Sequence, residues 1–459
     1  MSSFGRTLAA HLLLLLLLAF AATGWPGAWA QGAPDAPAAT LPSDLAFVAP
    51  DGRLAWLPAG EARIRTIGSP TGRHAFPAWS PDGRRLAVIV RDADGARAEV
   101  VDLGVAGAGA GGGARRAVWF EEADEPVIYL DWADDGASLL LLVADADAGF
   151  RLVRADANGR RTLARGAPLY WDQRADGGVV VHAGGPSGSR LTLVDAAGRE
   201  TGELPRPGAF RSPAVSPSGD WLAYGAQERD GARRVLVVPA PDATPAASAN
   251  TDGAAFADGR RALGHRGLSA FAWHPARDLL ALTRPLSDVP HSFGPLGGLD
   301  AASGRFAPWV DEPVVAFWWS PDGRRVAVLA VDAAGGGPVA GSGGAPIPVG
   351  LRRAQAEGSA FRLGIVDVDA GVTRWLATVT PSRTFLSQEL PFFDQYARSH
   401  ARWSPDGTRL ALSVRNAAGR EAIWIVDVAT GTPLELAAGA MPAWPPVPPT
   451  AEPVVQRPF

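Results

Sequence analysis

The chain has 459 residues, a formal net charge of −4 and no cysteine, and all 43 of its basic residues are arginine. Without cysteine the protein has no disulfide, no thiolate metal site and no cysteine nucleophile, and without lysine it lacks both the lysine of a phosphate-binding loop and a Schiff-base lysine. The arginines are scattered along a slightly acidic chain, so the basic patch of a nucleic-acid-binding protein is not expected.

The first thirty residues have the pattern of an export signal. Arg6 supplies a positive start, Leu12 to Leu18 is an unbroken apolar run, and Ala28 and Ala30 are small residues at the positions that a signal peptidase reads. We therefore predict a signal peptide at 1–30 and a linker at 31–43. An uncleaved membrane anchor is the alternative, but the apolar stretch is shorter than the roughly 20 residues that a spanning helix needs. The mature protein is expected to be periplasmic or extracellular, with no stable membrane span.

Three short strands are predicted directly after the linker, at 45–48, 53–57 and 63–67. Each is a short run rich in apolar residues and bounded by turn residues such as Gly and Pro. They form three strands of a sheet whose first strand is missing from this end of the chain.

A repeat begins after these strands. The sequence Trp-Ser-Pro-Asp-Gly starts at Trp79, Trp319 and Trp403, and weaker copies share its frame. The slot that the tryptophan occupies falls at residues 79, 132, 173, 215, 273, 319 and 403, so most intervals are 41–58 residues long. That spacing is typical of a four-stranded propeller blade.

Each repeat has the composition of a strand, a tight turn and a second strand. Ser-Pro-Asp-Gly is a preferred sequence for a type I turn, because Pro fixes its own φ and Gly suits the last position. Short apolar runs rich in branched residues follow, as at 86–90, 139–143 and 326–331. No amphipathic helix is expected after the signal.

The two ends of the chain complement each other. Met441 to Trp444 resembles Phe76 to Trp79 but has no blade after it. If this last strand pairs with the strands at 45–67, the ring is closed and no sheet edge is left unpaired at the junction. The fold class is therefore all-β: a β-propeller, most simply of eight four-stranded blades with one blade shared by the two termini, and with seven blades as the alternative.

The Trp-Ser-Pro-Asp-Gly unit, followed by an Asp-x-x-x-Gly turn as at Asp367 and Asp427, resembles the TolB-type propeller repeat. Related blades occur in the propellers of dipeptidyl peptidases and prolyl oligopeptidases. The resemblance covers about residues 44–447 and implies a TolB-like propeller. The N-terminal α/β domain of TolB and the hydrolase domain of the peptidases are not expected, since no sequence is left for them.

Motifs that carry chemistry are few. No Gly-x-Ser-x-Gly elbow occurs, and the histidines after the signal have no paired metal-ligand spacing. Acidic pairs such as Asp92 with Asp94 and Asp145 with Asp147 lack the further ligands of a calcium loop, so turn capping is the simpler interpretation. No cofactor, no metal site and no catalytic residue is predicted.

Three long connections are predicted to share one face of the propeller, at 285–295, 332–359 and 380–400. The last of them mixes aromatic and charged side chains in a way that is typical of binding surfaces. The candidate binding surface comprises Phe385, Glu389, Phe392, Phe393, Asp394, Tyr396, Arg398 and His400. The alternative is that these aromatics plug the central channel.

These observations predict an exported, non-catalytic propeller that binds another protein or a peptide in the cell envelope, and that is a monomer. Two alternatives remain: a propeller hydrolase or lyase with its site at the channel mouth, and an accessory propeller of a separately encoded peptidase or transporter. A Pro-rich tail is predicted at 448–459.

Overall fold

The computed structural model describes residues 40–104, 114–122, 124–185, 188–204, 212–227, 233–240, 261–285, 292–331 and 360–447. The predicted signal peptide at 1–30, most of the linker at 31–43, the loop at 332–359 and the tail at 448–459 lie outside these residues. Within the described ranges, no helix is long and apolar enough to cross a membrane.

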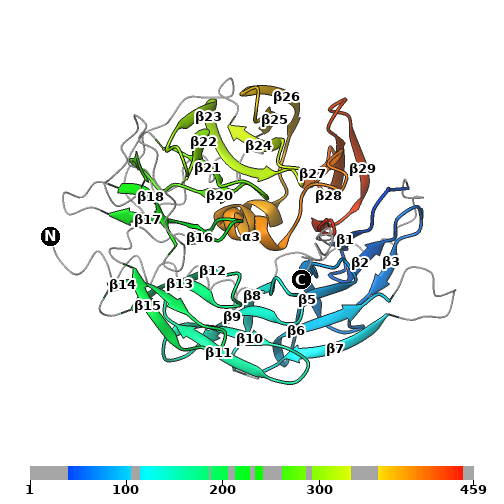
Figure 1. The fold of residues 1–459 in the computed structure, drawn as a ribbon. Coiled ribbons are helices and arrows are strands. Elements are labelled where there is room, and N and C mark those ends of the chain that lie inside the picture. Colours follow the sequence, from blue (N-terminus) through cyan, green and yellow to red (C-terminus); the bar gives the residue numbers. More distant parts are fainter. Residues whose placement is uncertain are drawn as a thin grey trace, which may run out of the picture.

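The strands form a ring of antiparallel sheets around a central axis (Figure 1). Across the described ranges, five sheets have four strands, one seven-stranded sheet consists of two blades that share β23, and one three-stranded sheet is a further blade. The expected all-β propeller is confirmed, and the count is eight blades.

We number the blades in chain order and give each from its innermost strand outward. Blade 1 consists of β30 (Ala440–Ala443), β1 (Leu45–Val48), β2 (Leu54–Leu57) and β3 (Arg65–Ile67). Blade 2 consists of β4 (Arg73–Trp79), β5 (Arg85–Asp92), β6 (Gly95–Asp102) and β7 (Arg115–Phe120). Blade 3 consists of β8 (Val127–Trp132), β9 (Leu139–Asp145), β10 (Gly149–Ala155) and β11 (Arg160–Arg165). Blade 4 consists of β12 (Leu169–Gln173), β13 (Val179–Gly185), β14 (Gly188–Val194) and β15 (Glu200–Leu204).

The second half of the ring is less regular. Blade 5 consists of β16 (Ala214–Val215), β17 (Trp221–Gln227), β18 (Arg233–Pro239) and β19 (Arg261–His265). Blade 6 consists of β20 (Phe271–Trp273), β21 (Leu279–Thr283), β22 (Gly294–Asp300) and the first part of β23 (Phe306–Trp319). The rest of β23 begins blade 7, which continues with β24 (Arg325–Val331), β25 (Phe361–Asp367) and β26 (Val372–Val379). Blade 8 consists of β27 (Arg409–Arg415), β28 (Glu421–Asp427) and β29 (Pro433–Ala438), and its inner position is filled by residues 401–403 through isolated bridges.

The two ends of the chain close the ring. β30 pairs antiparallel with β1, so that Ala46 lies opposite Ala443 and Val48 lies opposite Ala440. This pairing confirms the predicted blade shared by the termini. It gives β1 a partner on its inner edge, so the junction between the two ends of the chain leaves no open edge on β1.

The Ser-Pro-Asp-Gly segments are hairpin turns, as predicted. In the first of them Ser80 Oγ donates to Asp82 Oδ1 at 2.5 Å, and the backbone N–H of Arg85 donates to Ser80 Oγ at 3.0 Å. Gly83 has φ +68°, a left-handed conformation that glycine adopts at no steric cost. The turns at Ser320 and Ser404 repeat these hydrogen bonds. We call the side of the ring that carries these turns the turn face, and the opposite side the loop face.

The tryptophans of the repeat join neighbouring blades. At five of these slots the indole N–H donates to a backbone carbonyl on the innermost strand of the preceding blade, at the residue before that blade's slot. These hydrogen bonds are Trp79 to Ala443 (2.9 Å), Trp132 to Ala78 (3.0 Å), Trp273 to Ala214 (2.9 Å), Trp319 to Ala272 (3.1 Å) and Trp403 to Trp318 (3.0 Å).

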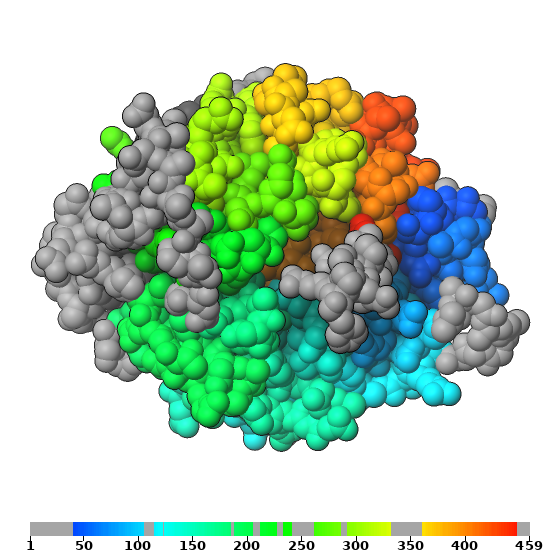
Figure 2. Space-filling view, viewed as in Figure 1, coloured from blue at the N-terminus to red at the C-terminus, as the bar shows by residue number. Residues whose placement is uncertain are grey.

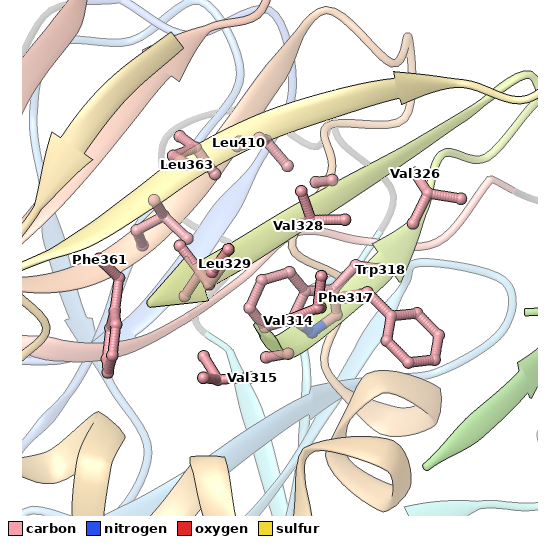
Figure 3. Close-up of a cluster of buried hydrophobic side chains, with 14 of the residues drawn as sticks. Val314, Val315, Phe317, Trp318, Val326, Val328, Leu329, Phe361, Leu363 and Leu410 are labelled. Carbon is pink, nitrogen blue, oxygen red and sulfur yellow. The ribbon is translucent and has the colours of Figure 1, made fainter. Parts of the chain in front are cut away.

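The core lies between the blades. Figure 3 shows part of the largest apolar cluster, in which Val314 and Phe317 of β23 pack with Val328 of β24, Leu363 of β25 and Leu410 of β27. Each is 1% exposed or less. Burying one such side chain contributes about 1.5–3 kcal/mol, so this cluster is a main source of cohesion between blades 7 and 8.

Candidate functional site

The centre of the ring is occupied by part of the chain itself. Residues 383–399, which we call the plug, form consecutive helical turns: η2 (Phe385–Glu389), η3 (Leu390–Phe392) and α3 (Phe393–Ser399). Figure 1 shows α3 at the middle of the ring, and in Figure 2 atoms coloured as residues near 400 form the floor of a central hollow.

The sequence predicted no amphipathic helix after the signal and did not indicate these short helical turns. Pro391 interrupts the segment, and the three helical pieces have 5, 3 and 7 residues. A helix this short shows no clear period of 3.6 residues in its sequence, and it depends on tertiary packing for stability.

Most of the candidate binding residues lie inside the ring. Buried side chains, each 8% exposed or less, belong to Phe385, Glu389, Phe393, Asp394, Tyr396 and His400. Only Phe392 and Arg398 are half-buried and within reach of solvent. Six of the eight predicted binding residues are therefore buried inside the ring and are not exposed on its surface. Their position is that of the alternative, an aromatic plug of the channel.

Aromatic rings tie the plug to several blades. Tyr396 stacks on Phe76 of β4, with ring centroids 5.0 Å apart and planes 7° apart, and meets Tyr129 of β8 edge-on at 5.0 Å. Phe393 meets Phe317 of β23 edge-on at 5.3 Å. Such pairs contribute about 0.5–1.5 kcal/mol beyond the area that they bury.

A kinked inner strand presents Phe76 to this stack. Phe76 has φ +55°, and Met441 at the matching place in β30 has the same φ. The backbone N–H of Phe76 donates to Met441 Sδ at 3.3 Å. A positive φ is strained for residues with a side chain, so the two kinked strands support each other beside the plug.

Two carboxylates fasten the middle and the beginning of the plug to blade 8. Glu389 forms an ion pair with Arg402, whose Nη1 also donates to the carbonyl of Pro442 at 2.7 Å, and both charged side chains are 3% exposed. At the start of the plug, the backbone N–H and the hydroxyl of Thr384 donate to Glu421 at 2.8 and 2.9 Å.

The end of the plug is fastened across the channel by Arg398. Its guanidinium pairs with Asp172 of β12 at 2.8 Å and donates to the carbonyls of Trp171 (3.0 Å) and Pro213 (2.8 Å). Arg398 and Asp172 side chains are 23% and 18% exposed. This contact is therefore the part of the plug's attachment that solvent reaches.

Two further carboxylates lie close to that contact, toward the turn face. Asp131 is the next-to-last residue of β8, and Asp134 follows in the turn of blade 3. Burial raises the pKa of Asp131 to about 7, with smaller raising effects from Asp134 and Asp172 and a lowering effect from Arg398. Burial also raises the pKa of Asp172, and Arg398 opposes that shift. We call Asp131, Asp134, Asp172 and Arg398 the channel-mouth group.

The channel-mouth group was not among the residues predicted from the sequence. One signal was present: Asp131 and Asp172 each stand directly before the tryptophan slot, where blades 1, 2, 5 and 6 have alanine. Comparing the repeats position by position would have marked them. Among the described residues, no group of three or more His, Asp or Glu side chains is arranged to hold a metal ion.

A hydrogen-bonded chain links the plug to blade 3. Tyr129 Oη donates to the carbonyl of Gln395 at 3.1 Å and lies 2.9 Å from Ser399 Oγ, which is 2.6 Å from His400 Nδ1. Burial lowers the pKa of His400 to about 4, so this imidazole is neutral near pH 7. The arrangement holds α3 against β8 through neutral groups.

The other two predicted loops each connect the second and third strands of one blade. The loop at 285–295 joins β21 to β22, and the loop at 332–359 joins β24 to β25, so both connect the second and third strands of a blade. The strand ends that bound these two loops lie on the loop face. Residues 286–291 and 332–359 themselves are outside the described ranges.

Comparisons with known proteins concern the fold. No protein-family model matches the chain, and no curated protein sequence matches it. A eukaryotic initiation factor structure is 13% identical over 89% of this chain and 100% of that chain, with a TM-score of 0.52. Dihydro-heme d1 dehydrogenase NirN is 15% identical over 94% of this chain and 84% of that chain, with a TM-score of 0.49.

TolB from Acinetobacter baumannii is 12% identical over 88% of this chain and 67% of that chain, with a TM-score of 0.38. At these identities a likeness concerns architecture and not activity. The four-stranded antiparallel blades themselves show the β-propeller fold.

Proposed function

We propose that this protein is an exported propeller that binds another protein or a peptide in the cell envelope, and that the loop face is its docking surface. The observation that carries the proposal is the plug. Because aromatic side chains of the chain itself fill the channel, the ring is a rigid support with two broad faces. Broad faces suit macromolecular partners, whereas small molecules are usually held in concave pockets.

The position of the long connections supports the loop face over the turn face. The strand ends that bound the connections at 285–295 and 332–359, and the entry of the plug after β26, lie on this side of blades 6, 7 and 8. Loops on a rigid scaffold commonly carry binding residues. Phe392 of the plug is half-buried, so it is an aromatic side chain that a partner can reach.

Capture from the native envelope fraction tests the proposal. The tagged protein is compared with a variant in which residues 336–355 are replaced by a short Gly-Ser linker, and with Phe392→Ala. We expect one specific partner to be retained by the unmodified protein and lost from the loop variant, with Phe392→Ala weakening capture. The exposed Arg63→Gln variant is the control. Equal capture by all four proteins, or none above background, contradicts the proposed docking face.

A second candidate function is favoured by one observation, the raised pKa of Asp131. A carboxyl group with a pKa of about 7 can donate a proton at neutral pH, and Asp172 beside it is paired with Arg398. The candidate is a hydrolase or lyase with its site at the channel mouth. It predicts turnover in a panel of p-nitrophenyl esters and glycosides that Asp131→Asn abolishes. Turnover that survives this substitution, or none at all, excludes Asp131 as the acid.

A further inference from the structure

Arg91 is an unusual arginine at the loop-face end of blade 2. It is half-buried near the end of β5, yet it has neither a hydrogen bond nor an ion pair with any other residue that the structure describes. Its neighbour Arg97 on β6, in contrast, pairs with Asp92 and with Glu99. A partly desolvated charge without a partner costs free energy, so Arg91 is a place where a ligand of opposite charge would be stabilised.

Strand geometry directs Arg91 toward the plug. Side chains two residues apart on a strand share a face, so Arg91 lies on the same side of β5 as Ile89. Ile89 packs in the apolar cluster that contains Tyr396 and against which Phe392 rests. Burial lowers the pKa of Arg91. Burial also raises the pKa of Tyr396, and the positive charge of Arg91 opposes that rise. Arg91 and the plug are therefore electrostatic neighbours.

The cross-strand neighbour of Arg91 increases the cost of its charge. Arg91 lies directly opposite Arg73 on β4, and like charges in this position are destabilising. The same repeat position in blade 8, twelve residues after the tryptophan slot, is also an arginine, Arg415. Arg415 lies opposite Glu421 of β28, whereas the equivalent neighbour of Arg91 on β6 is Ala96, so blade 2 has no carboxylate at this place.

We propose that Arg91 binds an oxyanion, a carboxylate or a phosphate, at the loop face beside Phe392. A guanidinium binds both groups through paired N–H donors. The inference deepens the proposed function and rests on it for its biological meaning, because the anion would belong to the partner that docks on this face. Anion binding itself can be measured on the purified protein alone, so the two proposals can fail separately.

The test is thermal unfolding of the purified protein with two probes, inorganic phosphate and hexaglutamate, at constant ionic strength. We expect at least one probe to raise the Tm saturably in the unmodified protein and in the control Arg63→Gln, which removes an exposed arginine. The same probe should leave the Tm of Arg91→Gln unchanged. The probe that acts shows whether the site prefers phosphate or carboxylate.

A second readout separates ligand binding from a structural role. Without any added anion, Arg91→Gln should unfold at the same temperature as the unmodified protein or a higher one, because the substitution removes an unpaired charge opposite Arg73. A Tm that falls in Arg91→Gln would overturn the inference, since it would mean that Arg91 supports the fold. Equal Tm shifts with and without Arg91, or no saturable shift with either probe, would overturn it as well.

Discussion

The ring and the plug of this propeller are held together by different kinds of contact. Blades of the ring repeat one local design, a tight turn and an indole N–H that donates to the preceding blade, so its cohesion is spread over many similar interfaces. The plug has no repeat, and it depends on one buried ion pair, a few aromatic contacts and Arg398. Single substitutions should therefore cost more in the plug than in the ring.

The largest effect is expected at the buried ion pair. Glu389→Gln leaves the buried guanidinium of Arg402 without a carboxylate, and an unpaired buried charge of this kind costs about 3–5 kcal/mol. Urea unfolding at pH 7 measures the loss. Both charges are absent from the double variant Glu389→Gln with Arg402→Met, which should recover much of the stability. If the double variant is less stable than Glu389→Gln alone, the cost does not come from the unpaired charge.

A smaller loss is expected from the plug's aromatic rings. Phe393 is 3% exposed, and Phe393→Ala should cost about 3 kcal/mol through lost packing and the cavity that remains. Its neighbour Phe392 is half-buried, so Phe392→Ala should cost about 1 kcal/mol or less. Thermal unfolding of the two variants side by side makes the comparison. Similar small losses for both variants would mean that the packing of Phe393 inside the ring contributes little to stability.

The contrast between ring and plug also explains what could be predicted from sequence. The tryptophan slot was visible because Ser-Pro-Asp-Gly is a local turn signal, and the innermost strands of blades 2 to 7 end at the residues of that slot. Closure by β30 followed from the likeness of Met441 to Trp444 and Phe76 to Trp79. Local signals that recur confirm one another, which is why the ring could be assigned.

The plug and the channel-mouth group could not be assigned in the same way. A segment with Phe385, Phe392, Phe393 and Tyr396 fits an exposed binding loop and a buried plug equally well, because the difference lies in the room at the centre of the ring. The pairing of Arg398 with Asp172 joins residues more than 200 positions apart. No local sequence pattern indicates such a contact. Within this group, only Asp131 and Asp172 could have been noticed in the sequence, because they occupy matching repeat positions.

The pH dependence of stability should differ between Asp131 at the channel mouth and His400 inside the ring. Asp131 has a folded pKa of about 7 against an unfolded value near 4, so between these values the folded state binds the extra proton and stability rises as the pH falls. His400 has a folded pKa of about 4 against an unfolded value near 6.5, so its contribution falls as the pH falls through that window. The two contributions oppose each other between about pH 4 and 6.5.

Two variants separate these contributions. Asp131→Asn should be more stable than the unmodified protein at pH 8, by about 1–2 kcal/mol after screening by solvent, and should match it near pH 4. His400→Gln should lose less stability than the unmodified protein on going from pH 6.5 to 4. Asp134 and Asp172 shift in the same direction as Asp131, so part of the rise toward acid should remain in Asp131→Asn. Urea unfolding at pH 4, 6.5 and 8 gives the comparison, and a stability of Asp131→Asn that stays below the unmodified protein at pH 8 contradicts the assignment.

The smallest effect is expected within the ring, where two tryptophans at the same repeat position differ in one hydrogen bond. Trp403 Nε1 donates to the carbonyl of Trp318 at 3.0 Å, whereas Trp444 Nε1 is buried without a partner among the described residues. Both side chains are 2% exposed or less, so replacement by phenylalanine removes similar packing at each site. Trp403→Phe also removes a hydrogen bond and leaves a buried carbonyl without its donor, which costs about 1 kcal/mol more. Trp444→Phe instead removes an N–H group that already had no partner. The Tm of Trp403→Phe should therefore lie below that of Trp444→Phe. Equal values would show that packing of the indole rings, and not the hydrogen bonds between blades, holds the ring together.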